Sequence, residues 1–111
     1  MNYHNKTFRA IGNSENGEVS SETIFYYKQQ GEILTARYSG GEIVEGHLIG
    51  KVDVDGRIDM RYHHINQKGD LMTGKCHSIP EVMKNGKIRL HEEWEWTSGD
   101  LSKGTSFIEE I

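Results

Sequence analysis

The feature that most constrains this chain is an alternation of apolar and polar residues that runs along its whole length and is interrupted by glycine-containing pairs. Successive side chains of a β-strand point to opposite faces, so a period of two predicts strands, and no window keeps a helical period. The interrupting pairs supply the positive φ angles that tight hairpins need. They are Asn16-Gly17, Gln30-Gly31, Gly40-Gly41, Asp55-Gly56, Lys68-Gly69, Asn85-Gly86 and Ser98-Gly99.

The segments between these turns predict eight antiparallel strands joined in sequence order as a meander. Pro80 lies in 78–84, where the alternation weakens; this segment predicts a longer connection, with room for a short helix, or the edge end of a strand. Eight strands without a covering helix expose two sheet edges unless the sheet closes, so we expect an all-β small barrel, with residues 1–111 as a single domain. The expected strands are 6–12, 21–29, 33–39, 43–52, 57–66, 71–78, 87–98 and 105–111.

Charge and cysteine content limit which classes of partner and which cell compartment are expected. The net charge is -4, and the 13 basic residues are scattered without a run, so we expect no nucleic-acid partner. The one cysteine, Cys76, can form no intrachain disulfide, which fits a reducing compartment. No signal-peptide pattern or membrane-length apolar stretch is present, so we expect a cytoplasmic protein without a membrane partner. A homodimer is left open.

Alternation also sorts the side chains by face. In 87–98 one face carries two tryptophans and two aliphatic residues, so this face is predicted to be interior, and it includes Glu92. Segments 21–29 and 105–111 have apolar residues on both faces, so their inward faces are left open. The predicted interior residues are Leu34, Ala36, Tyr38, Val44, Gly46, Leu48, Gly50, Val52, Ile58, Met60, Tyr62, His64, Met72, Gly74, Cys76, Ile88, Leu90, Glu92, Trp94 and Trp96.

A short internal repeat supports the hairpin arrangement. Residues 41–47 and 69–75 share the order turn glycine, acid, two apolar residues, any residue, glycine and a basic-type residue. Each copy predicts one hairpin unit with a glycine inside the strand, where the sheet can bend.

The predicted interior is more aromatic and more polar than a core of aliphatic side chains. Aromatic walls with a few convergent polar groups are typical of a small-molecule pocket, and an eight-stranded barrel either holds one small ligand or fills with side chains. A buried carboxylate needs a partner: Glu92 could bind a ligand cation or hydroxyl, act as an acid or base, or be held structurally by an indole N–H, a tyrosine, Arg37 or Arg61. The candidate ligand-binding residues are Tyr38, Tyr62, His64, Glu92, Trp94 and Trp96.

The sequence contains no motif for a metal, a cofactor or covalent catalysis, so we expect no metal and no cofactor, and no catalytic residue can be assigned. His63 and His64 are adjacent on a strand and point to opposite faces, and no His-Glu-x-x-His or paired-cysteine spacing exists. The stretch 53–56 lacks the spacing of a calcium loop. A nucleophile elbow, a phosphate-binding loop and a dinucleotide fingerprint are also missing, and an inward Cys76 predicts a small core residue.

Three stretches together resemble a family of short bacterial proteins that carry the label N-acetylglutamate synthase. They are Asn16-Gly17-Glu18 with Ser21-Glu22-Thr23, Tyr38-Ser39-Gly40-Gly41 with 46–50, and 86–92 with Trp94-Glu95-Trp96-Thr97. That resemblance implies acetyl transfer, yet the chain lacks the glycine loop and helix with which such acetyltransferases hold acetyl-CoA, so we expect no acetyl-CoA binding. The predicted barrel also resembles the lipocalin, fatty-acid-binding and avidin group of meander barrels.

The sequence leads to three competing hypotheses about function. The leading hypothesis is a barrel that binds a small, partly apolar molecule without performing chemistry. The second is an enzyme that uses inward acid and histidine side chains, including the acetyl transfer that the family label asserts. The third is a structural or interaction barrel whose interior is filled. A cavity would separate the first two from the third, and polar groups converging on one point would favour the enzyme.

Overall fold

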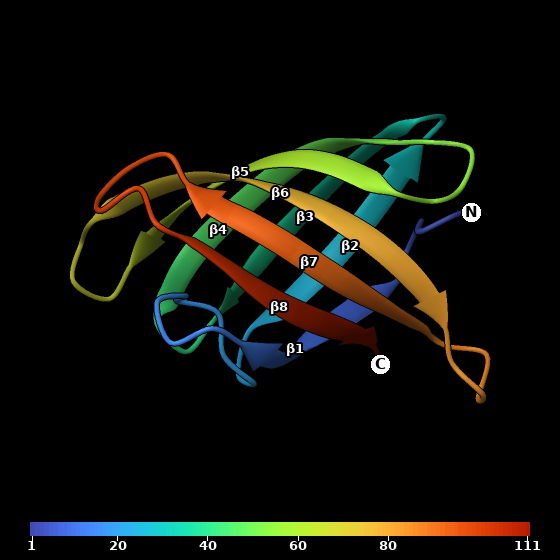
Figure 1. The fold of residues 1–111 in the computed structure, drawn as a ribbon, viewed down its shortest axis with the longest axis horizontal. Helices are drawn as coiled ribbons and strands as arrows, with labels where there is room; N and C mark the ends of the chain where they lie inside the picture. Colours follow the sequence, from blue (N-terminus) through green and yellow to red (C-terminus); the bar gives the residue numbers. More distant parts are fainter.

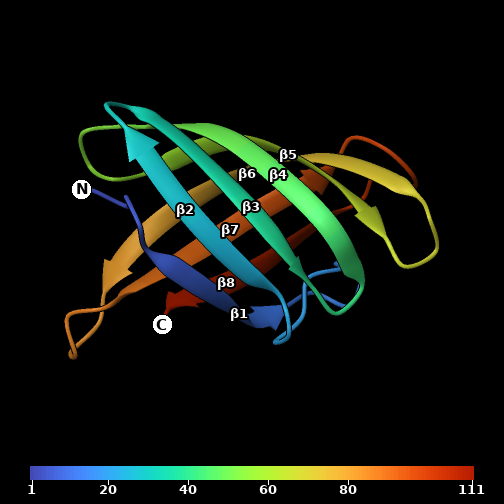
Figure 2. The same ribbon diagram turned by 180° about the vertical axis from the view of Figure 1, so that it is seen from behind.

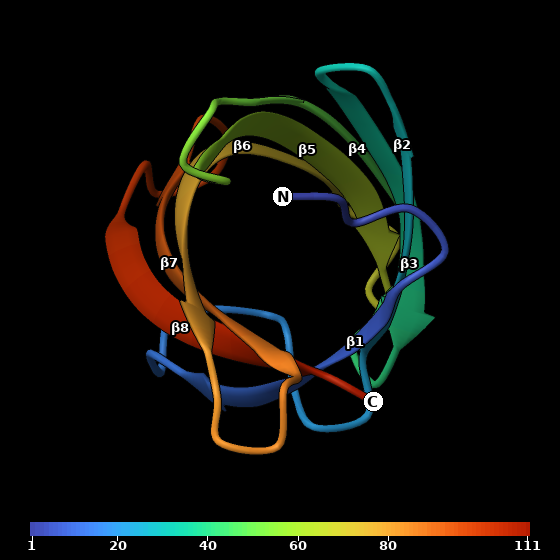
Figure 3. The same ribbon diagram turned by 90° about the vertical axis from the view of Figure 1, so that its right-hand side faces the viewer.

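The computed structural model describes all 111 residues, and they form a closed barrel of eight antiparallel strands in sequence order (Figure 1). The last strand pairs with the first, so neither edge is free, as the ring of strands in Figure 3 shows. The predicted all-β meander barrel is therefore confirmed. The structure contains no helix with the length and apolar character that membrane crossing requires. The strands are β1 (Thr7–Asn13), β2 (Ile24–Gln30), β3 (Ile33–Gly40), β4 (Ile43–Val52), β5 (Ile58–Asn66), β6 (Leu71–Val82), β7 (Ile88–Trp96) and β8 (Lys103–Glu110).

The predicted strands match the observed ones within a few residues, except at the end of β6. Segment 78–84 contains no helix and is not a long connection, because β6 continues through Pro80 to Val82. Pro80 pairs with Leu90 on β7, whereas the pairing of β6 with β5 ends at Ser78. Beyond Ser78, the side of β6 that faces β5 has no partner strand, so the missing backbone N–H of Pro80 leaves no ladder bond unmade. Of the alternatives, the edge end of a strand is the correct one.

The prediction that Val44 points inward is wrong. A β-bulge between Ile43 and Glu45 inserts one extra residue into the ladder with β5. The alternation is interrupted there, and the next inward-facing side chain before Gly46 is that of Ile43. Val44 is 52% exposed and Ile43 is 1% exposed. The other predicted interior residues do lie on the inner face, where Tyr62, Met72 and Glu92 are half-buried.

One end of the barrel is filled with side chains. The rings of Tyr3, Phe8 and Tyr27 pack together there with centroid distances of 4.8–6.4 Å, and all three are fully buried. The N-terminal segment lies across this opening (Figure 3), and the Tyr3 hydroxyl donates to the carbonyl of Gly56. Large apolar side chains complete the plug: Leu34, Ile58, Leu90 and Ile108.

The opposite end is covered by the connection between β1 and β2, residues 14–23, which we term the mouth loop (Figure 2). Six hairpins turn at a glycine with positive φ, but Asn16-Gly17 belongs to this longer connection, and Gly17 is not among the positive-φ glycines. Ser14 ties the loop to β8, because its backbone N–H and hydroxyl both donate to the carbonyl of Thr105 at 2.9 Å. The mouth loop is therefore a fixed cover in this structure.

Three inward glycines each lie beneath an aromatic ring of the neighbouring strand. Tyr38 pairs with Gly46, Tyr62 with Gly74, and Trp94 with Gly104, and a Cβ on any of these glycines would overlap the ring. The repeat of 41–47 and 69–75 corresponds to this unit, and 99–104 forms a third copy with a turn glycine and an inward glycine. The rings consequently lie against the barrel wall.

Replacing Gly74 with alanine is expected to lower the free energy of unfolding by about 1–3 kcal/mol, because the added methyl group would push the Tyr62 ring off the wall. Urea melts measure this change. The control is Lys75→Ala at the exposed neighbouring position, which should change stability by no more than about 0.5 kcal/mol. Equal effects of the two substitutions would show that the ring is not held against the glycine.

Candidate functional site

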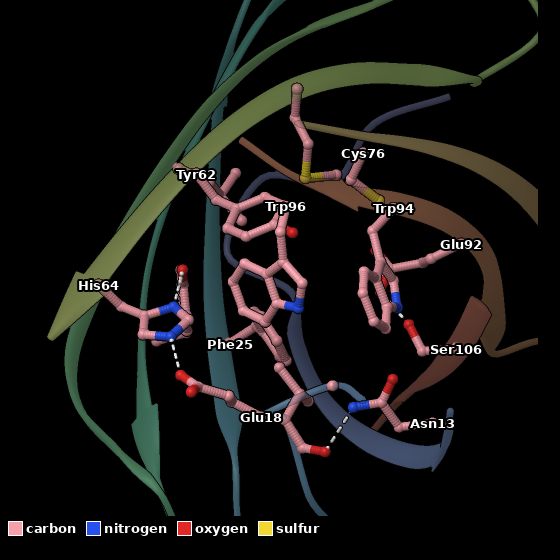
Figure 4. A pocket seen from close by; sticks show the side chains of 15 residues that line it. Asn13, Glu18, Phe25, Tyr62, His64, Cys76, Glu92, Trp94, Trp96 and Ser106 are labelled. Atoms are coloured by element: carbon pink, nitrogen blue, oxygen red, sulfur yellow. Dashed lines mark hydrogen bonds and ion pairs between the residues drawn. The ribbon is translucent and has the colours of Figure 1, made fainter. Parts of the chain in front are cut away.

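A cavity lies in the half of the barrel beneath the mouth loop (Figure 4). The space that the centre of a water molecule can reach inside it is about 50 Å³, which is room for a few waters. All six predicted site residues line this one cavity: Tyr38, Tyr62, His64, Glu92, Trp94 and Trp96. The structure thus brings them together, while their role in binding a ligand stays a prediction.

Aromatic rings, histidine included, come from six of the 15 residues that line the cavity. Trp96 is at the centre, with the rings of Tyr62, His64 and Trp94 edge-on or tilted against it at centroid distances of 5.8, 5.7 and 5.6 Å. Its indole Nε1 donates to the carbonyl oxygen of Asn16 at 3.0 Å, so the ring is also fixed to the mouth loop. Such packed rings hold their positions without a ligand, as a preformed site requires.

A first polar group links the mouth loop to β5 and β3. The Glu18 carboxylate accepts hydrogen bonds from Nε2 of His64 at 2.7 Å and from Nδ2 of Asn66 at 3.0 Å. With Nε2 as the donor, Nδ1 of a neutral His64 accepts from the Tyr38 hydroxyl, which is 2.9 Å away. Every polar atom of this group therefore has a partner.

A second polar group runs across four neighbouring strands on the opposite wall. The strand registers place Ser78 beside Glu92, Glu92 beside Ser106, and Ser106 beside Asn13. We call these four residues the polar row. The Ser78 and Ser106 hydroxyls donate to the two carboxylate oxygens of Glu92 at 3.0 and 3.2 Å. Figure 4 shows Asn13, Ser106 and Glu92 on one side of the cavity and His64 with Glu18 on the other.

Burial raises the pKa of Glu92 from 4.5 to about 7, although the hydrogen bonds from Ser78 and Ser106 favour the ionised form. No lysine or arginine lines the cavity to offset the burial. Arg37 and Arg61, considered from the sequence as partners, are exposed on the outer face, and the two serines hold the carboxylate instead. Glu92 therefore carries a desolvation cost that its surroundings only partly compensate.

Two buried polar atoms have no hydrogen-bond partner, Oδ1 of Asn13 and the hydroxyl of Tyr27. The Asn13 amide nitrogen donates to the carbonyl of Val19 at 2.7 Å, which leaves its oxygen as the free atom. Burial raises the pKa of Tyr27 well above its usual value, and the nearby Glu92 carboxylate raises it further. Buried polar atoms without partners are uncommon. Asn13 lines the cavity, so a ligand bound there can supply the missing donor, whereas Tyr27 belongs to the plug.

Sequence reasoning missed part of this site. Glu18 and Asn13 lie in or next to the mouth loop, where no alternation assigns a face. Phe25 and Ser106 belong to the two strands whose faces were left open, and both line the cavity. Ser78 shares the parity of Cys76, so the inward face of β6 could have identified it.

The arrangement suits binding better than catalysis. The two polar groups lie on opposite walls and do not converge on one point, and Cys76 is buried with a pKa raised well above its usual value, mainly by burial. No group of three or more histidine, cysteine, aspartate or glutamate side chains is arranged to hold a metal ion.

Comparison with known proteins agrees with the barrel. A search of curated proteins and a search of solved structures gave no match. The comparisons give no support to the N-acetylglutamate synthase label. Against protein families, residues 1–111 match the avidin-like proteins. The match spans the whole chain, and the chain folds as the closed eight-stranded meander described above. The chain therefore belongs to the family of avidin-like proteins.

Proposed function

We propose that this protein binds a small, partly apolar molecule in the cavity beneath the mouth loop. The observation that carries the proposal is the contrast between the two ends of the barrel. One end is plugged by large apolar side chains, whereas the other keeps a cavity with aromatic side chains in its wall and a buried amide oxygen, Oδ1 of Asn13, that lacks a partner. A barrel with a purely structural role gains nothing from such a space, because cavities lower stability. Membership in the avidin-like family is consistent with a ligand-binding barrel.

The size of the cavity limits what it takes while the mouth loop is in place. An apolar cavity of about 150 Å³ accommodates benzene, so about 50 Å³ suits a compound of only a few non-hydrogen atoms. A larger ligand, biotin included, would have to displace the mouth loop and break the hydrogen bonds of Glu18 and Asn16. A screening panel should therefore start from small fragments and add larger compounds, with biotin among them.

Tryptophan emission provides the assay, because the chain has two tryptophans and both line the cavity. A compound that enters should change the emission in a saturable way. Leu48→Phe, which adds volume inside the cavity, should weaken binding at least about tenfold, since overpacking competes with the ligand. Ile49→Phe, at the neighbouring exposed position, should bind as the wild type does.

The filled-barrel alternative predicts a different result. In that case no compound of the panel changes the emission, and Leu48→Phe stabilises the protein because it fills a packing defect. This pair of results would overturn the proposed function.

A further inference from the structure

The cavity lining contains more acidic than basic groups, and its one basic side chain, His64, is already engaged by Glu18 and Tyr38. Two carboxyl groups, Glu18 and Glu92, contribute to its lining, and no lysine or arginine does. Glu18 is already engaged through both oxygens by His64 and Asn66, and the Tyr38 hydroxyl completes that network. Glu18 is thus already held by two nitrogen donors, one of them the imidazole of His64, whereas Glu92 is held by serine hydroxyls and has no nitrogen donor.

The polar row still has free acceptors. Each oxygen of Glu92 accepts one hydrogen bond, from Ser78 or Ser106, whereas a carboxylate offers about four lone-pair positions. Oδ1 of Asn13, two strands away in the same row, is buried and has no donor. What this side of the cavity lacks is a donor.

The rings beside the polar row fit the same kind of ligand. Trp94 and Trp96 lie against each other at 5.6 Å next to Glu92, and both line the cavity. An indole face attracts a cation, most strongly where water is excluded. Carboxylate, amide oxygen and indole faces thus surround one small volume with negative potential.

We propose that the cavity takes a small organic cation, an amidinium or ammonium group whose N–H bonds donate to the Glu92 carboxylate and to Oδ1 of Asn13, and that it rejects carboxylates. This inference rests on the proposed function, for which it names the ligand class. A carboxylate in the same place would be buried beside Glu92 with no lysine or arginine to pair with, and the ring nitrogens of His64 are already engaged, so its burial is costly. A neutral amide can donate, but it brings no charge to offset the burial of Glu92.

The test compares three compounds of nearly identical shape: acetamidinium, acetamide and acetate, each with four non-hydrogen atoms. A second set, benzamidinium, benzamide and benzoate, carries the same three groups on a benzene ring and covers the case in which the cavity widens to take a larger ligand. Binding is followed at pH 8 and constant ionic strength through the two indole N–H signals in NMR spectra of ¹⁵N-labelled protein. We expect acetamidinium to bind about tenfold or more tightly than acetamide or acetate.

Two variants test whether the preference for the amidinium depends on the charge of Glu92. Glu92→Gln keeps the size of the side chain and removes the charge, so the preference for the amidinium should be lost. Glu93→Gln removes a charge from the outer face of the same strand and should keep the preference. Equal or tighter binding of the amide or the carboxylate would overturn the ligand class and leave cavity binding intact, and so would an unchanged preference in Glu92→Gln. Unmoved indole signals with all six compounds would instead overturn the proposed function and the ligand class together.

Discussion

Lowering the pH from 8 to 5 is expected to raise the free energy of unfolding of this protein by about 2.5 kcal/mol through Glu92 alone. The pKa of Glu92 is raised from 4.5 to about 7 in the folded state. The folded protein therefore holds this proton more tightly than the unfolded chain, and protonation favours folding. The stabilisation is fully present below pH 4.5 and is lost as the pH rises through about 7.

Urea melts at several pH values on the wild type, Glu92→Gln and Glu93→Gln measure this contribution. The glutamine at position 92 keeps hydrogen-bonding capacity toward Ser78 and Ser106 without a charge, so Glu92→Gln should be more stable than the wild type at pH 8 by about 2–3 kcal/mol. Its profile should lack the rise toward pH 5, whereas Glu93→Gln should keep it. A wild-type profile parallel to that of Glu92→Gln would place the carboxyl group in water and refute its assignment to the interior.

A carboxylate that lowers stability at neutral pH is more readily explained by function than by folding. A glutamine would cost the barrel less, since it keeps hydrogen-bonding capacity toward Ser78 and Ser106 without a charge, whereas the charge of Glu92 has no lysine or arginine beside it. Groups whose pKa is strongly shifted by burial cluster at binding and catalytic sites. The pH profile therefore measures how much the ionised carboxylate of Glu92 lowers the free energy of unfolding.

Trp96→Ala is expected to lower the free energy of unfolding by about 3–5 kcal/mol, which is the usual cost of removing a buried aromatic side chain. Trp96 is 5% exposed, and three other rings pack against it. The substitution also removes the indole N–H that holds the carbonyl of Asn16, so the mouth loop loses one of its attachments.

Chemical rescue distinguishes this wall position from an ordinary core position. The enlarged cavity should accept indole, and binding to the folded state raises the apparent stability in proportion to the logarithm of the ligand concentration. We expect millimolar indole to raise the melting temperature of Trp96→Ala and to leave the wild type nearly unchanged. Tyr26→Ala, which removes an exposed aromatic ring from the outer face, is the control for nonspecific effects. The interpretation would be wrong if indole stabilised all three proteins equally.

The sequence by itself determined the local features of this fold. Alternation assigned the inward face of five strands, because side-chain direction in a strand has a strict period of two. Glycine pairs located the six hairpins, because positive φ angles there exclude most other residues. These features depend on neighbouring residues alone, and they sufficed to put Glu92, Trp94 and Trp96 on one inner face.

Only the tertiary structure decided how the strands meet. The bulge that turns Val44 outward depends on the pairing with β5, and the edge position of Pro80 depends on where β5 ends. The polar row combines four strands, so it exists only once the barrel closes β8 onto β1. Glu18 reaches His64 because the mouth loop folds over the opening, and no periodic pattern encodes that path. Alternation fixes which way a side chain points, but strand register and loop course, which depend on residues far apart in the sequence, fix what it touches.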